Sequence, residues 1–310
     1  MNLEKLQKPI FFTILLLTLT PWISPPIALI LGIVLALTIQ NPIKDINHRL
    51  LTVLLKVSIV GIGFGLNVNN ALEIGKNGLL FTVFSVLGTV LFGLLLGKLL
   101  LNDIKISHLI SSGTAICGGT AVAAISPVIK ANEKQISVAL GTVFILNAVG
   151  LLLFPIIGEA LTLSQTQFGF WSALAIHDTS SVVGAASKFG EEALLTAATV
   201  KLGRTLWIIP FVLVSSLIFK SGKTKIQIPY FILLFIIAMI LSTYIPAINS
   251  YSSTIVMLAK KGFTVTLFLV GAGLSKEILK EVGVKPLLQG VLLWVAISVV
   301  SLLAVMNFIS

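Results

Sequence analysis

Long apolar stretches separated by short polar loops recur along the whole chain. A helix needs about 20 apolar residues to cross the hydrocarbon core of a bilayer. The pattern therefore predicts an all-α polytopic membrane protein with about nine to eleven transmembrane segments. The apolar stretches fall at residues 10–23, 27–40, 50–66, 78–101, 107–129, 135–157, 168–187, 194–219, 228–245, 255–274 and 286–308.

Two of these segments, 107–129 and 168–187, contain residues that suit a continuous helix poorly. The first holds the run S-S-G-T-A-I-C-G-G-T-A-V-A-A-I-S-P, and the second holds A-I-H-D-T-S-S-V-V-G-A-A-S-K. Glycine lowers helix stability, and proline removes a hydrogen bond of the helix. We expect both segments to be interrupted helices. The sequence leaves open whether each one breaks while crossing the membrane or returns to the side from which it came.

Short internal sequence repeats suggest that the chain consists of two related halves. Residues 115–116 are repeated as 175–176, and the Gly-x-Gly-Leu motif at 63–66 is repeated at 271–274. Interrupted segments in corresponding places of two inverted repeats are typical of secondary transporters. We therefore predict a single membrane transport domain, 1–310, with an extra N-terminal helix at 1–25, a first repeat at 26–158 and a second repeat at 168–310.

The distribution of Lys and Arg residues among the loops helps to choose between the possible topologies. The chain is 56% hydrophobic and 10% charged, and its formal net charge is +10. In so apolar a chain we attribute the positive charge to cytoplasmic loops that face anionic lipid, rather than to nucleic-acid binding. If every segment crosses and the N-terminus is inside, twelve Lys and Arg residues face the inside and four face the outside. If both interrupted segments return, the numbers become fourteen and two, which the positive-inside rule favours.

The first apolar run, 10–19, follows Lys5 and Lys8, as the apolar core of a signal peptide also would. No small-x-small cleavage site precedes Pro21. We therefore expect an uncleaved first helix with a cytoplasmic N-terminus.

The adjacent pair His177 and Asp178 is the strongest candidate for chemistry. An ionisable residue within hydrocarbon costs about 3 kcal/mol on insertion scales, so such residues usually face water, a partner charge or a substrate. Asp178 can bind a cation, accept a proton or cap a half-helix, and His177 titrates near neutral pH and suits proton coupling. The alternative is a structural pair of buried hydrogen-bonding groups.

Small polar residues around the two interruptions are candidates for substrate binding. Helix N-termini at a broken segment present N–H groups to an anion, and hydroxyls suit oxyanion or ion coordination. The alternative is that these residues only allow helices to pack closely and to hydrogen-bond. The candidates are Gly118, Gly119, Thr120, Thr179, Ser180 and Ser181.

Two cations are embedded in the eighth segment. Lys201 and Arg204, at i and i+3, share one helix face and need counter-charges. We expect Asp178 to pair with one of these cations and a substrate anion to pair with the other. The planar guanidinium group of Arg204 suits sulfate, sulfonate or carboxylate. The alternative is snorkelling of the side chain to an interface. Asn147, in the equivalent place of the sixth segment, is a weaker candidate.

Other functions have less support. His177, Asp178 and Ser180 include the residue types of a hydrolase triad, but neighbouring positions do not give the required geometry, so we expect no enzyme. No Cys/His cluster predicts a metal site, and we expect no cofactor. Lys260 and Lys261 interrupt the tenth segment and are expected to mark the interfacial start of its helix. Cys117 is the single cysteine, which excludes an intrachain disulfide.

The runs S-G-T-A-I-C-G-G-T-A-V-A-A-I-S-P-V-I-K, F-G-F-W-S-A-L-A-I-H-D-T-S-S-V-V-G-A-A and A-T-V-K-L-G-R-T-L-W-I-I-P resemble the YeiH-type sulfate exporter family. The resemblance covers nearly the whole chain. It implies a multi-pass protein of the bacterial inner membrane and a secondary carrier built from inverted repeats. The resemblance assigns no role to individual residues. The motif residues that it carries over are Cys117, Gly118, Gly119, His177, Asp178, Thr179, Ser180, Lys201 and Arg204.

We therefore expect a secondary transporter of a small anion such as sulfate, a sulfonate or a related organic anion, coupled to H⁺ or Na⁺ through Asp178 or His177. The alternative is a cation/proton antiporter that binds its ion at Asp178, with Lys201 or Arg204 as a structural counter-charge. A third interpretation is a membrane scaffold or sensor. It has less support, because the sequence predicts no soluble domain through which such a protein would signal. The sequence does not determine the oligomeric state, and a homo-oligomer is one of the possible states.

Overall fold

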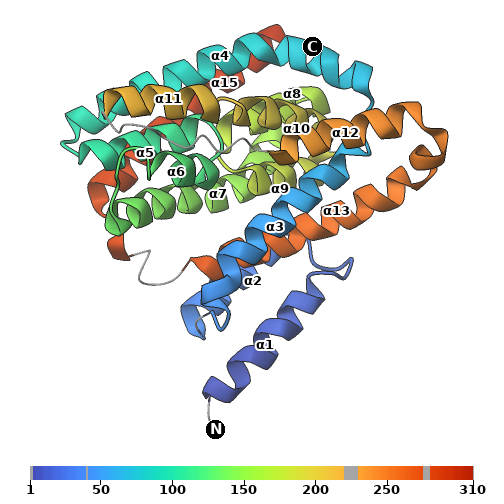
Figure 1. The fold of residues 1–310 in the computed structure, drawn as a ribbon, viewed down its shortest axis with the longest axis horizontal. Helices are drawn as coiled ribbons and strands as arrows, with labels where there is room; N and C mark the ends of the chain where they lie inside the picture. The colour runs from blue at the N-terminus through green and yellow to red at the C-terminus, as the bar shows by residue number, and fades with distance from the viewer. Residues whose placement is uncertain (1–2, 40, 220–229, 275–279, 310) are drawn as a thin grey trace.

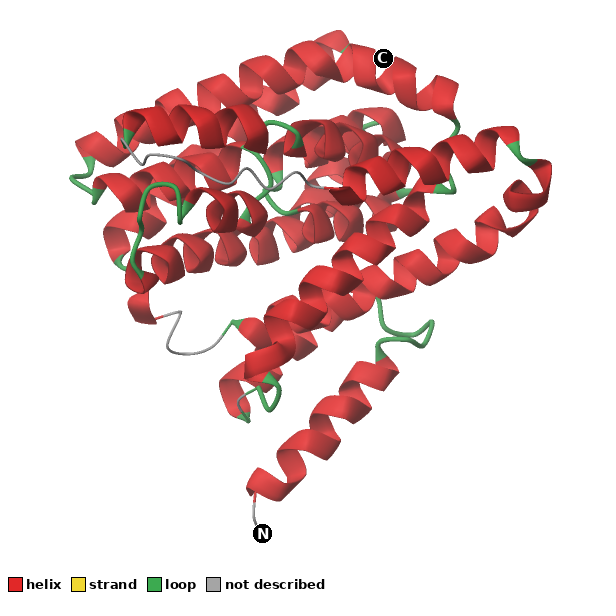
Figure 2. Ribbon diagram, in the orientation of Figure 1, coloured by secondary structure: helices red, strands yellow, loops and turns green. Residues whose placement is uncertain are grey.

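The protein was analysed as a computed structural model that describes residues 3–39, 41–219, 230–274 and 280–309. Within these residues the chain is all-helical, and no strand is found (Figures 1 and 2). The helices are α1 (Leu3–Leu17), α2 (Pro25–Thr38), α3 (Lys44–Gly63), α4 (Val68–Leu99), α5 (Ile104–Ala115), α6 (Gly119–Ile125), α7 (Glu133–Ala160), α8 (Gln165–Ala175), α9 (Thr179–Phe189), α10 (Glu191–Thr205), α11 (Ile208–Ile218), α12 (Tyr230–Tyr244), α13 (Pro246–Gly273) and α15 (Val284–Phe308).

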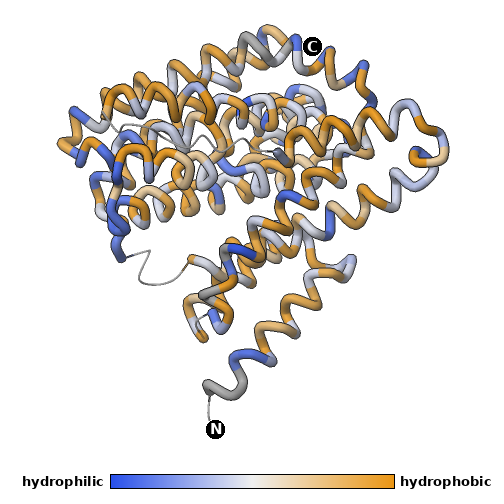
Figure 3. The backbone as a smooth tube through the Cα atoms, viewed as in Figure 1, coloured by the Kyte–Doolittle hydropathy of each residue, from blue (hydrophilic) through white to orange (hydrophobic). Residues whose placement is uncertain are grey.

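Several helices have the length and apolarity of membrane spans. Five spans meet both criteria, and one of them runs through α10 and α11. A sixth is formed if α3 and the start of α4, which are bent by 108° at a short break, count as one span. The remaining apolar helices are shorter, such as α2 and α12, or belong to the interrupted segments. Hydrophobic positions lie along nearly every helix, and hydrophilic positions gather at turns (Figure 3). The predicted all-α membrane protein with two interrupted segments is confirmed.

Helices α2, α3, α12 and α13 form a group beside the rest of the molecule, with α1 at its edge (Figure 1). The closest crossing in this group depends on two glycines. A Cβ on Gly32 of α2 would overlap the carbonyl oxygen of Phe268, and one on Gly271 of α13 would overlap the carbonyl oxygen of Leu29. Any side chain at either position would separate the two helices.

The central helix is α7, and a capping box sets its start. The side chain of Asn132 accepts a hydrogen bond from Gln135 N at 2.8 Å, and the Gln135 side chain accepts one from Asn132 N at 2.9 Å. These bonds satisfy two N–H groups that the first turn of a helix leaves unpaired. With 28 residues, α7 is about 42 Å long at 1.5 Å per residue.

The segment before α7 is a re-entrant hairpin, which we call hairpin one and which comprises α5, α6 and the break between them. Its two ends lie together. Lys105 donates to the carbonyl oxygen of Lys130 at 2.7 Å, and Gln135 donates to Asp103 at 3.0 Å. Since α5 has only 12 residues, or about 18 Å, it reaches about halfway across the hydrocarbon core before the chain turns back.

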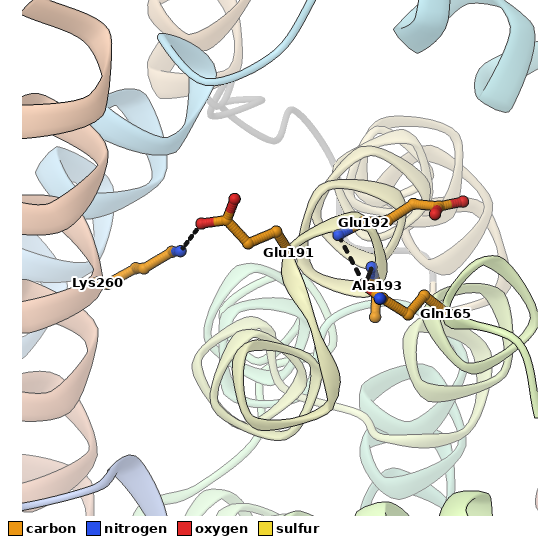
Figure 4. A network of polar contacts seen from close by, with 5 residues as sticks. All are labelled: Gln165, Glu191, Glu192, Ala193 and Lys260. Carbon is orange, nitrogen blue, oxygen red and sulfur yellow. Dashed lines mark hydrogen bonds and ion pairs between the residues drawn. The ribbon is translucent and has the colours of Figure 1, made fainter.

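The segment after α7 is also re-entrant. We call α8, α9 and the break between them hairpin two. Its ends are joined by the side-chain oxygen of Gln165, which accepts from Glu192 N at 3.1 Å and from Ala193 N at 3.4 Å (Figure 4). The rings of Phe168 and Phe189 stack at 3.9 Å between centroids. Since hairpin one begins beside the start of α7 and hairpin two beside its end, the two hairpins enter from opposite ends of α7.

The helix boundaries correct one prediction. Helix α13 begins at Pro246, so Lys260 and Lys261 lie well inside it and do not mark its start. Lys260 instead forms an ion pair with Glu191 at 2.7 Å, which joins α13 to the first residue of α10 (Figure 4). Lys261 donates to the carbonyl oxygen of Thr20 in the turn after α1.

Other predictions remain open. The basic residues 220, 223, 225 and 276, which contribute to the charge argument, lie outside the described residues. The two inverted repeats also stay a prediction. The echo at 115–116 and 175–176 does fall on equivalent places, since α5 ends at Ala115 and α8 ends at Ala175.

Candidate functional site

The tips of the two hairpins meet beside the midpoint of α7. Asn147 stands at this midpoint, and its side-chain oxygen accepts from His177 N at 3.0 Å and from Asp178 N at 3.2 Å. From the other hairpin, Gly118 packs against Asp178, and a Cβ on Gly118 would lie 3.4 Å from Asp178 Cα and Cβ. Gly118 has a φ of +63°, which L side chains rarely adopt. Glycine is therefore favoured here by the backbone conformation of the turn, whereas the distance to Asp178 is an ordinary van der Waals contact that would admit a Cβ.

Asp178 caps helix α9 from the break in hairpin two. Its Oδ2 atom accepts from Ser180 N at 3.1 Å and from Ser181 N at 3.2 Å, and it also accepts a bond from the Ser180 hydroxyl. An aspartate at this position satisfies unpaired N–H groups and places negative charge at the positive end of the helix dipole. All the described hydrogen bonds of the carboxylate go to Oδ2, and the side chain is 8% exposed.

Arg204 of α10 joins the ends of α5 and α8. Its Nε atom donates to the carbonyl oxygen of Ala115 at 2.9 Å, and Nη1 donates to that of Ala173 at 3.1 Å. Nη1 also donates to Leu174 O, and Nη2 donates to Ala115 O and, at 3.4 Å, to Thr114 O. Five donor contacts are therefore directed at carbonyls that helix C-termini leave unpaired. The positive charge also suits the negative ends of two helix dipoles.

Lys201, one turn earlier on α10, supports hairpin two alone. Its Nζ atom donates to the carbonyl oxygen of Ile176 at 2.7 Å and to that of Ala173 at 3.3 Å. Both Lys201 and Arg204 have no exposed surface. The two cations therefore stabilise the same break from one helix face, as their i, i+3 spacing predicts.

These contacts correct the expectation that Asp178 pairs with Lys201 or Arg204. Within the described part of the chain, the ion pair between Lys260 and Glu191 is the one that is found. The buried charges at the tips are satisfied by the backbone instead, because each break leaves helix ends of opposite polarity. Cations bind the C-terminal carbonyls of α5 and α8, and the carboxylate binds the N-terminal amides of α9.

Several buried polar atoms at the tips have no hydrogen-bond partner among the described residues. They are the hydroxyl of Thr114, the amide nitrogen of Asn147, and both ring nitrogens of His177. Leaving a buried polar group unpaired costs roughly 1–3 kcal/mol, so native proteins keep few of them. Since His177 N donates to Asn147 Oδ1, these two residues lie together, and the atoms left without a described partner make the hairpin tips a candidate site for a polar ligand.

The other predicted binding residues lie in different surroundings. Thr179, Ser180 and Ser181 form the buried first turn of α9. Gly119 is half-buried at the start of α6, and Thr120 is exposed there. The geometry thus brings hairpin two and Gly118 together at the centre and leaves Thr120 away from it. Whether these residues bind substrate stays a prediction.

Asn147 has a more central position in the structure than the sequence analysis predicted. A single asparagine in the apolar run 135–157 gives only a weak signal, and the position of the hairpin tips decides its partners. The carbonyl groups that hold Arg204 carry no side-chain signal at all. The echo of 115–116 in 175–176 was the one indication that these helix ends are equivalent.

Comparison with known proteins identifies relatives along nearly the whole chain. Residues 14–290 match the family profile described as "Conserved hypothetical protein 698". A "UPF0324 membrane protein" of Bacteroides thetaiotaomicron is 52% identical over 290 residues, which cover 93% of this chain and 88% of the relative. One of Porphyromonas gingivalis is 47% identical over 319 aligned positions, covering 97% of this chain and 96% of the relative.

A third "UPF0324 membrane protein", of Photobacterium profundum, is 49% identical over 293 residues and covers 94% of this chain and 90% of the relative. No solved structure gives a significant match. The chain therefore belongs to the UPF0324 family of membrane proteins, which is the YeiH-type family that its motifs resemble.

Proposed function

We propose that this protein is a secondary transporter, rather than an enzyme, and that it carries a small anion through the point where the hairpin tips meet. The observation that supports this most is the balance of buried charge. The described buried residues include two cations, Lys201 and Arg204, and one carboxylate, Asp178. An excess of one positive charge in a low-dielectric interior favours binding of an anion.

The proposed substrate is sulfate, a sulfonate or a related organic anion. Arg204 and Lys201 attract it through space, since their described donors are directed at backbone carbonyls. Direct hydrogen bonds come from the unpaired groups of Thr114, Asn147 and His177. Protonation of Asp178, or its binding of Na⁺, would couple a second ion to the substrate. We place the protein in the bacterial inner membrane with a cytoplasmic N-terminus, as the loop charges favour.

Thermal stabilisation of the purified protein tests the proposal. A ligand at 100 times its dissociation constant adds about 2.7 kcal/mol to the stability of the folded state. The screen includes sulfate, sulfite, thiosulfate, taurine, small carboxylates, Na⁺ and a pH series. One anion is expected to raise the melting temperature, and a rise with Na⁺ alone would contradict an anion carrier.

Thr114→Val is the sharpest variant for the site. Its hydroxyl has no hydrogen-bond partner among the described residues, so its loss should leave the unliganded protein equally stable or more stable. The loss of a hydrogen bond to a charged ligand should weaken anion binding by about tenfold or more. Thr142→Val is the matched control, because that buried hydroxyl bonds Val138 O of its own helix. An unchanged anion response in Thr114→Val would remove Thr114 from the site.

A cation/proton antiporter is the second candidate, and one observation favours it: the described bonds of Asp178 leave Oδ1 for an ion. Asp178→Asn separates the two proposals. Asparagine is also a good N-cap, so the fold should persist. An antiporter would lose its response to Na⁺ and pH in this variant, whereas an anion carrier would retain its response to the anion.

A further inference from the structure

The base of hairpin one brings together lysines from several helix ends. Lys105 of α5 donates to the carbonyl oxygen of Lys130, which follows α6, at 2.7 Å. Asn102 donates to the carbonyl oxygen of Lys285, near the start of α15, at 3.2 Å. One end of each of three candidate membrane spans, in α4, α7 and α15, lies here. We call the following residues the lysine surface: Lys98, Lys105, Lys130, Lys134 and Lys285.

The positive charge of the lysine surface is not balanced by its neighbours. Its five lysines stand beside two carboxylates, Asp103 and Glu133, which leaves a net charge of +3. Asp103 is engaged elsewhere, since its Oδ1 atom accepts from Lys105 N at 2.9 Å and from Gln135 at 3.0 Å. Within the described parts of the chain, none of the five lysines forms an ion pair. All of them except the half-buried Lys105 are exposed, so their ammonium groups are open to an anionic partner.

The opposite end of α7 has a different charge. Three exposed glutamates, Glu159, Glu191 and Glu192, lie at the base of hairpin two, together with the exposed Lys188. One of these glutamates, Glu191, pairs with Lys260. The unpaired positive charge is therefore concentrated at the base of hairpin one.

Two side chains at this base occupy backbone positions that favour glycine. Leu101, just after α4, has a φ of +54°, and Lys130 has a φ of +52°. Each closes a Schellman motif, in which Asn102 N donates to Gly97 O at 2.9 Å and Ala131 N donates to Ser126 O at 2.9 Å. Glycine is usual at this position because a Cβ strains the left-handed conformation. Strain of this kind is concentrated at functional sites.

Leu101 is one of several exposed apolar side chains among these lysines. It is 80% exposed, and Val284, next to Lys285, is 81% exposed. Leu99 and Ile104 are also more than half exposed. Apolar side chains beside lysines suit the surface of a bilayer, where the former enter the acyl region and the latter contact anionic headgroups. A soluble anion would use the lysines alone.

We propose that the lysine surface and the apolar side chains beside it bind an anionic glycerophospholipid. Its phosphate contacts the ammonium groups, and its acyl chains contact Leu101 and Val284. Membrane spans end at this level, so the headgroup region of the bilayer lies beside the lysines. Lys105 and Lys130 belong to the two ends of hairpin one, so bound lipid stabilises the base of this hairpin. The proposal is independent of the substrate at the hairpin tips.

Lipid titration of the purified full-length protein in detergent tests the proposal. Phosphatidylglycerol is the anionic probe, and it should raise the melting temperature more than phosphatidylcholine, which has no net charge. Glycerol 3-phosphate carries the anionic group without acyl chains and should give no comparable rise. An equal rise with phosphatidylcholine would overturn the proposal, and so would an equal rise with glycerol 3-phosphate.

Lys134→Gln combined with Lys285→Gln removes two exposed ammonium groups from the lysine surface. The phosphatidylglycerol concentration that gives half of the maximal rise should increase about 30-fold. Lys76→Gln combined with Lys188→Gln is the matched control, because both lysines are exposed and lie outside the lysine surface. Both double variants should melt at the wild-type temperature without lipid. Equal half-maximal concentrations in the two double variants would contradict the assignment.

Leu101→Gly separates backbone strain from lipid binding. Glycine relieves the positive φ, so the melting temperature without lipid should be equal or higher. The half-maximal phosphatidylglycerol concentration should nevertheless increase about fivefold through lost apolar contact. Thr162→Gly is the control, since Thr162 has a φ of +50° after α7, at the base of hairpin two. A wild-type titration of Leu101→Gly would overturn the assignment to a lipid.

Hydrogen exchange locates the bound lipid. Phosphatidylglycerol should slow exchange at residues 101–106 and 130–135, which form the base of hairpin one. Exchange at residues 161–166, at the base of hairpin two, should stay unchanged. Equal slowing at both bases would show that the lysine surface is not the binding site.

Discussion

The two hairpins share one plan and differ in chemistry. Each has a helix that reaches about halfway across, a break of three residues and a second short helix that returns. The break in hairpin one reads Ile-Cys-Gly at 116–118, and that in hairpin two reads Ile-His-Asp at 176–178. The last two residues of each break differ most, because hairpin one has no ionisable carboxylate or imidazole there.

This difference indicates that the two hairpin tips have complementary roles. Hairpin two supplies the charge and the hydrogen-bonding groups, and it is held by Asn147, Lys201 and Arg204. Hairpin one supplies the tight turn at Gly118, whose positive φ places its backbone in contact with Asp178. Arg204 is the residue that contacts both hairpins through their α5 and α8 ends. Three substitutions should separate these tasks.

Arg204→Ala should have the largest effect, because it affects both hairpins. It leaves the carbonyls of α5 and α8 without their donors and opens a cavity in the core. Each buried carbonyl left without a donor costs roughly 1–3 kcal/mol, so we expect a large fall in melting temperature or a loss of folded protein. Arg49→Ala is the control, since Arg49 is exposed on α3. A melting temperature equal to that of the control would mean that Arg204 does not hold the hairpins together.

Asn147→Leu should affect hairpin two selectively. It removes the acceptor of the His177 and Asp178 amides and leaves two buried N–H groups unpaired, at roughly 1–3 kcal/mol each. Hydrogen exchange should become faster at residues 176–181 and stay unchanged in hairpin one. Thr142→Val on the same helix serves as the control. Equal acceleration in both hairpins would mean that their tips are not held separately.

Gly118→Ala should have the smallest effect on stability. A positive φ costs a non-glycine residue about 1–2 kcal/mol. The methyl group would also lie 3.3 Å from Val143 Cγ1, which is a tight contact, and 3.4 Å from Asp178, which is an ordinary one. We expect a modest fall in melting temperature and a larger fall in ligand response, because the strained turn shifts hairpin one beside Asp178. Gly203→Ala is the control, since a Cβ there meets open space. An unchanged ligand response would show that close approach of hairpin one is not needed.

Much of the fold could be predicted from side-chain patterns. The apolar runs predict the helices, and Gly118, Gly119 and Pro127 predict an interruption, because glycine and proline change the cost of helical backbone locally. The limits of helices were harder to predict, as α13 shows by beginning at Pro246 rather than near Lys261. Helix α13 starts with a proline, a residue type favoured at the first helical position, and the two lysines are accommodated within the helix.

The sequence predicted which residues form the candidate site but not which groups they contact. His177, Asp178, Lys201 and Arg204 stand out in the sequence because charge within an apolar run is costly. Their contacts could not be predicted, since charges of opposite sign at this depth suggest an ion pair. The pairing with helix ends depends on where two breaks are placed in space.

The sequence by itself determined the membrane class, the two interrupted segments and the residues that carry charge, because each follows from local composition. Only the tertiary structure decided that both segments return, as the bonds from Lys105 and to Gln165 show. It also decided that the tips meet at Asn147 and that backbone carbonyls accept the hydrogen bonds of Arg204. The physical reason is that helix ends expose unpaired carbonyls and amides with partial charges. Those groups belong to no side chain, so their positions are set by how the hairpins fold against α7.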